Sequence, residues 1–116
     1  MTAKNPYESL KIPFLGDAVP VEAKSMWTIT DSRDETITIS TARLPDNMWV
    51  YGYIVNWANG RTSCQRTTAE LGKFRSQREA RLYAIGFMLL YLKHFTEATQ
   101  SALRKAESKL LQIELF

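Results

Sequence analysis

The chain changes its hydrophobic period once, from short alternating runs in its first part to a helical pattern in its last part. Between residues 26 and 68, runs rich in β-branched and aromatic residues are separated by turn-forming residues. Ile37 and Ile39 alternate with threonine and serine, a period of two that is typical of a strand with one buried face. We therefore expect strands at 26–30, 36–41, 48–57 and 61–68, with turns at 31–34 and 44–47.

The last two strands are separated by Asn59-Gly60, a pair that favours a two-residue type I′ hairpin loop. In the register that follows, Val55 pairs with Cys64 and Tyr51 pairs with Thr68. A one-residue slip would exchange the two faces of the strands, so this assignment depends on the turn type.

One face of the strand 48–57 is aromatic. It carries Trp49, Tyr51, Tyr53 and Trp57. Two interpretations stay open: the rings pack under a helix as core, or they stay exposed and stack on unpaired bases.

The helical pattern begins at Gln77. Ser76 and Glu79 have the spacing of a capping box, in which each side chain bonds the backbone N–H of the other residue. Over 77–95 the pattern is apolar on two sides, which predicts a helix buried on both sides. One side fits the sheet, and the other needs the N-terminal residues, the C-terminal tail or a second subunit. A cap at Thr96 predicts helical structure over 97–114, either as a bend of one long helix or as a hairpin of two helices.

These elements predict an α+β fold, with a three- to four-stranded antiparallel sheet packed by one long helix and a further C-terminal helix. Residues 1–22 hold three of the four prolines and are expected to form an extended N-terminal arm. Residues 23–116 are expected to form a single α+β domain.

Positive charge is concentrated where the predicted sheet meets the helix. The whole chain has a formal net charge of +3, but residues 61–81 hold six cations against Glu70 and Glu79. The cations are Arg61, Arg66, Lys73, Arg75, Arg78 and Arg81. Backbone N–H groups at a helix start already favour an anion, so this segment predicts phosphate contacts. We expect a non-enzymatic nucleic-acid-binding accessory or regulatory protein, for which DNA and RNA both remain open. The alternative is a solvated basic face.

The same segment resembles the second half of the double-stranded-RNA-binding domain. The resemblance rests on Asn59-Gly60-Arg61, on Gly72, and on the helix start 76–81 followed by Ala84. It implies that cations of the first helical turn, here Arg78 and Arg81, grip phosphates across a groove. Gln77 stands where the family has a lysine, and the N-terminal helix of the family is not recognisable in this chain.

The aromatic strand with this helix start is also similar to small domains encoded by phage and mobile elements, some of which occur beside ParB-like nucleases or DNA methyltransferases. The sequence contains no ParB catalytic motif and no methyltransferase motif, so this similarity implies no activity.

The sequence offers little for catalysis or metal binding. Cys64 is the single cysteine and His94 the single histidine, without metal-ligand spacing around them. Glycine-rich phosphate loops are absent. We therefore expect no enzyme activity, cofactor or metal. The absence of a signal-like or membrane-spanning run favours a cytoplasmic protein without membrane contact. The alternative function is a protein-interaction module that dimerises, or docks on a larger protein, through its apolar C-terminal helices.

Overall fold

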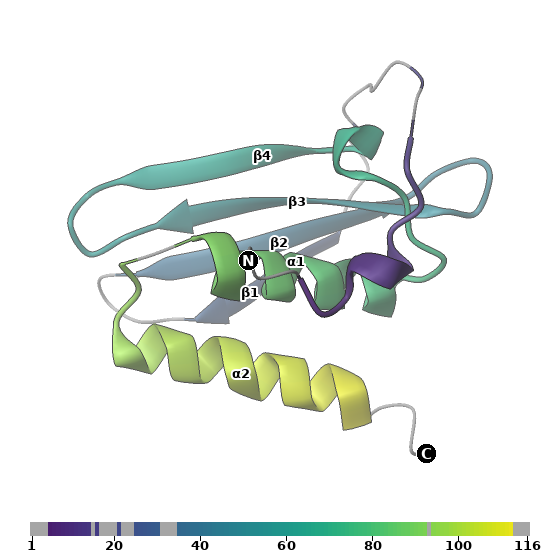
Figure 1. The fold of residues 1–116 in the computed structure, drawn as a ribbon. Helices are drawn as coiled ribbons and strands as arrows, with labels where there is room; N and C mark the ends of the chain where they lie inside the picture. The colour runs from purple at the N-terminus through teal and green to yellow at the C-terminus, as the bar shows by residue number, and fades with distance from the viewer. Residues whose placement is uncertain are drawn as a thin grey trace, which may run out of the picture.

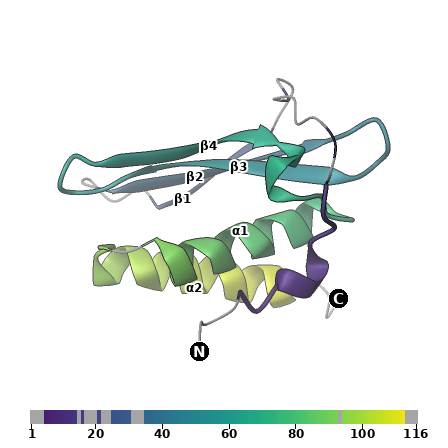
Figure 2. The same cartoon turned by 45° about the horizontal axis from the view of Figure 1, so that its top comes forward.

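The protein folds into two layers, with a sheet on one side and two helices on the other. A computed structural model describes residues 5–14, 16, 21, 25–30, 35–92 and 94–112. The elements in chain order are η1 (Glu8–Leu10), β1 (Ser25–Thr30), β2 (Thr36–Arg43), β3 (Trp49–Asn56), β4 (Thr62–Thr68), η2 (Ala69–Leu71), α1 (Gln77–Tyr91) and α2 (Glu97–Gln112). The helices lie side by side beneath the sheet, as Figures 1 and 2 show from two directions. None of the described helices is long and apolar enough to span a membrane.

The sheet is antiparallel, and its four strands follow one another in sequence order. This confirms the predicted α+β fold of a four-stranded antiparallel sheet, a long helix and a C-terminal helix. The turn after β2 forms as predicted, with Asn47 donating its backbone N–H to the carbonyl of Leu44. The turn predicted at 31–34 lies outside the described residues.

The predicted register of the β3–β4 hairpin is wrong by one residue near its tip. Trp57 donates its backbone N–H to the carbonyl of Arg61, so the loop has three residues and Gly60 takes a positive φ of 87°. A type I turn followed by a left-handed residue is the usual form of such a loop. Val55 therefore pairs with Ser63, and Cys64 lies on the sheet face away from the helices.

A bulge in β4 then restores the predicted register. Tyr53 pairs with Gln65 but Tyr51 pairs with Thr68, so two residues of β4 lie opposite Gly52. A Cβ atom on Gly52 would lie 2.5 Å from the backbone oxygen of Gln65 and 2.6 Å from the backbone nitrogen of Thr67. The bulged backbone therefore leaves room only for glycine at this position.

The helix boundaries follow from local hydrogen bonds. The Ser76 hydroxyl accepts from the N–H of Glu79 at 3.1 Å, which confirms the cap, but the Glu79 carboxylate accepts from the N–H of Arg75 rather than of Ser76. α1 ends at Tyr91, four residues before the predicted end, and α2 starts after Thr96, whose hydroxyl accepts from the N–H of Thr99. The two helices therefore form a hairpin rather than one bent helix.

Both apolar sides of α1 are covered within the chain. Its sheet side packs against β2 and β3, in a core with Ile37, Ile39 and Tyr51. Its other side contacts α2 and the N-terminal segment, where Asn5 donates to the carbonyl of Tyr83. Tyr91 is the only exposed residue of α1. The N-terminal segment and α2 thus cover the second apolar side of α1, for which the sequence analysis left a second subunit as an alternative.

Described parts of the N-terminal arm lie against the body of the protein. Ile12 forms a β-bridge with Lys73, and Val21 donates its N–H to the carbonyl of Thr67. Phe14 and Val21 also pack on a small second core, on the sheet face away from the helices, built around Val50.

Candidate nucleic-acid interface

Three of the six predicted phosphate-binding cations contact other residues of the chain. Lys73 pairs with Asp46 at 2.6 Å, and this hydrogen bond holds the pKa of the Asp46 carboxyl below its usual value. Arg78 donates from Nε to the carbonyl of Leu110 at 2.7 Å. Arg81 lies 4.8 Å from the ring centre of Trp27, and burial lowers the pKa of its guanidinium. These intramolecular contacts therefore engage three cations that the sequence analysis predicted to bind phosphate.

The other three cations are exposed, but they lie on different parts of the surface. Arg75 precedes the start of α1, and Arg61 lies at the tip of the β3–β4 hairpin. Arg66 lies in the β4 bulge and lines a hollow with Met26 and Ile54. The structure therefore does not gather the six cations on one surface at the helix start.

The aromatic strand face lies under the helices, as in the core interpretation. Tyr51 is fully buried and Tyr53 is 8% exposed, so neither ring is available to stack on a base. Trp49 is partly buried against the core. Trp57 is partly buried as well. It lies at the end of the sheet, where its exposed part lines a hollow.

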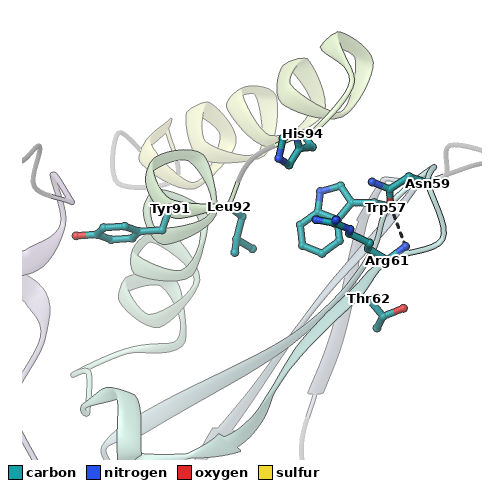
Figure 3. Close-up of a pocket in the computed structure, with 7 residues that line it drawn as sticks. All are labelled: Trp57, Asn59, Arg61, Thr62, Tyr91, Leu92 and His94. Carbon is teal, nitrogen blue, oxygen red and sulfur yellow. Dashed lines mark hydrogen bonds between the residues drawn. The ribbon is translucent and has the colours of Figure 1, made fainter.

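This hollow brings together two of the predicted residues, Trp57 and Arg61. It has a volume of about 410 Å³ and lies between the β3–β4 hairpin and the α1–α2 connection. Figure 3 shows the side chains that line it: Trp57, Asn59, Arg61, Thr62, Tyr91, Leu92 and His94. Figure 3 shows the Tyr91 ring pointing away from the other side chains, so one aromatic ring, a guanidinium and an imidazole share the hollow, with no carboxylate among its described lining residues. That combination suits an anionic ligand with a flat ring.

Local contacts fix the hairpin side of the hollow. The Trp57 ring stacks on Phe95, with ring centres 5.6 Å apart and planes 21° apart. The backbone N–H of Arg61 donates to Oδ1 of Asn59 at 2.9 Å, the bond drawn in Figure 3. The described residues offer no hydrogen-bond partner to Trp57 Nε1.

A buried carboxylate joins the two walls. Glu35 is 1% exposed and accepts the backbone N–H of Ala58 on the hairpin and of Thr96 on the α1–α2 connection. Its Oε1 also accepts the hydroxyls of Thr96 and Thr99, at 3.0 and 2.6 Å. Burial raises the pKa of Glu35, but these hydrogen bonds outweigh it and hold the pKa below its ordinary value. Glu35 therefore fixes the distance between the walls.

The hollow continues along α2. Leu92 and His94 also line a second hollow that reaches Arg104. Arg104 in turn lines a third hollow on the exposed side of α2, with Lys105 and Lys109. The described lining residues of these two hollows include no acid either. A cationic path therefore runs from Arg61 to Lys109.

The sequence analysis missed Tyr91, His94 and the cations of α2. Tyr91 follows the apolar pattern of α1, so it could not be distinguished from core. His94 has a positive φ of 71° in a connection that the sequence pattern predicted as helix. Residues 104, 105 and 109 share one helix face, and this spacing was the signal that could have revealed them.

The remaining reactive groups form no centre. Cys64 is exposed, and its β3 partner is Ile54. Within the described part of the chain, no group of three histidine, cysteine or acidic side chains could hold a metal ion.

Comparison of the chain with protein-family models, with curated proteins and with solved structures finds no match. The proposal below therefore rests on the geometry of the hollow and the charges around it.

Proposed function

We propose that this protein is a non-enzymatic nucleic-acid-binding accessory or regulatory protein. Its phosphate contacts centre on Arg61 and on the cationic side of α2, rather than on the start of α1. The observation that carries the proposal is the hollow at the end of the sheet. There the exposed Arg61 side chain lies beside Trp57, and no described lining residue is acidic.

The chemistry of the hollow matches a nucleotide in two ways. Aromatic rings stack on bases of any sequence because every base has a π-face. An arginine in the same hollow can bond the phosphate next to the stacked base. Such contacts give affinity that depends on salt and hardly on sequence, because phosphates carry most of the binding energy.

Fluorescence anisotropy of labelled oligonucleotides at several salt concentrations tests the proposal. We expect log affinity to fall linearly with log salt, by about 0.7–0.9 per phosphate contact. Arg61→Ala should weaken binding and reduce this slope. Arg66→Ala is the matched control, because it removes the same charge from an exposed residue of the same hairpin, outside the hollow.

Two results would refute the proposal. One is the absence of binding to DNA and RNA at low salt by the folded protein. The other is an equal loss of affinity in the two variants, since this would mean that net charge, and not the hollow, determines binding.

A further inference from the structure

We infer that the bound nucleic acid is a single strand, with one unpaired base in the hollow beside Trp57 and Arg61 and the following phosphates along α2. This inference rests on the proposed function and adds the class of ligand.

The size of the hollow argues for an unpaired base. Its volume of about 410 Å³ lies inside the range of roughly 300–1,000 Å³ found for small-molecule sites. A base in a duplex is stacked and paired, so it cannot enter a hollow unless it leaves the helix. The Asn59 amide and the Thr62 hydroxyl also line the hollow and can donate to and accept from the edge of a base.

The cationic path argues for a strand that continues along α2. His94 lies in both the first and the second hollow, and Arg104 lies in both the second and the third. Lys105 and Lys109 extend the third hollow along the exposed side of α2. A backbone that leaves the base hollow past His94 therefore meets three further cations in sequence order.

The contacts of the helix-start cations argue against a duplex. A domain that crosses a duplex groove with the first turn of α1 needs the charges of that turn to be available. Arg78 is bonded to the carbonyl of Leu110, and Arg81 lies on the Trp27 ring. Lys73, just before that turn, is paired with Asp46. The described contacts thus leave the hollow and α2 as the better surface for phosphates.

The experiment compares three labelled probes of about 12 nucleotides, a length within the 4–16 nucleotides typical of single-strand sites. The probes are oligothymidylate, oligouridylate, and oligothymidylate annealed to oligoadenylate. Trp57→Leu should weaken single-strand binding about 5- to 150-fold, the loss of one base stack, with an unchanged salt slope. Trp57→Phe keeps a ring and should keep most of the affinity, and circular dichroism checks that both variants fold. Tyr91→Ala is the matched control, because it removes a half-exposed ring that points away from the hollow in Figure 3.

A second variant tests the path along α2. Changing Arg104, Lys105 and Lys109 together to alanine should lower the single-strand salt slope by about 2, or about 0.7 for each lost phosphate contact. All three residues are exposed, so circular dichroism should show an unchanged helix content.

The outcomes separate the two proposals. Tighter binding of either single strand than of the duplex, with the loss in Trp57→Leu and its rescue in Trp57→Phe, supports the inference, and the preferred strand identifies the sugar. Equal binding of single strand and duplex with no effect of Trp57→Leu overturns the single-strand inference but leaves the proposed function standing. No binding of any probe overturns both.

Discussion

Replacement of Glu35 should show how strongly one buried carboxylate holds the structure together. Its side chain accepts four hydrogen bonds, two from backbone N–H groups and two from threonine hydroxyls. A hydrogen bond to a charged acceptor contributes about 1.5–3 kcal/mol, but bonds that share one acceptor are not additive. We therefore expect Glu35→Ala to lower the free energy of unfolding by about 3–5 kcal/mol, a large part of the roughly 5–15 kcal/mol of a typical domain.

Glu35→Gln provides a finer test of the same reasoning. The amide oxygen can still accept from the threonines, but the amide nitrogen would meet the N–H of Ala58, a donor against a donor. We expect a loss of about 1–3 kcal/mol. Glu97→Gln is the matched control, because Glu97 is exposed one residue after Thr96 and should change stability by less than about 0.5 kcal/mol.

The pH dependence gives the sign of the effect. The pKa of Glu35 is lower in the folded protein than its ordinary value, which is about 4.3 for a free side chain. Its stabilising contribution is therefore complete above that value and disappears as the pH falls through the folded pKa. Urea unfolding of wild type and Glu35→Gln at neutral pH and near pH 3 measures this directly. A stability difference that stays constant over this range would contradict the assignment of a charged, hydrogen-bonded Glu35.

Three further predictions test other contacts. Gly86→Ala should destabilise the protein by about 1–3 kcal/mol despite the higher helix propensity of alanine, because its Cβ would collide with the Asn5 side chain; an increase in melting temperature would contradict this. Arg78→Ala should lower the free energy of unfolding by about 1–2 kcal/mol through the lost hydrogen bond to the Leu110 carbonyl, and it should leave nucleic-acid affinity nearly unchanged. A large loss of affinity in an anisotropy titration would instead assign phosphate binding to the start of α1. His94→Gly should relieve about 1 kcal/mol of left-handed backbone strain, so thermal unfolding should show no loss of stability while single-strand binding weakens.

The fold was predictable because its main signals are local. Ser76 and Glu79 give the start of α1, Thr96 gives the start of α2, and the alternation of Ile37 with Ile39 shows which side of β2 is buried. Each signal acts within a few residues of the element that it defines.

The sequence predictions were wrong where residues far apart in the sequence determine the local structure. No glycine or proline ends α1 after Tyr91, but Glu35, far away in the sequence, binds Thr96 and so favours a connection there. The cations look alike in the sequence, and only the folded chain places Asp46 beside Lys73 and Trp27 beneath Arg81. Sequence reasoning therefore found the charge but could not tell which charges remain exposed.

The β3–β4 hairpin has two alternative pairings that differ only by the β4 bulge. If the bulge were lost, the segment from Thr62 to Gln65 would shift by one residue and close a shorter loop, while Thr68 would keep Tyr51 as its partner. The observed pairing is held by the hydroxyl of Thr62, which donates to Asn56 at 2.8 Å, and by the contact between the hydroxyls of Ser40 and Thr67. The slide would carry Cys64 from the open face to the helix side. A change in the reactivity of the Cys64 thiol would therefore report a shift of β4 in the hairpin that borders the hollow.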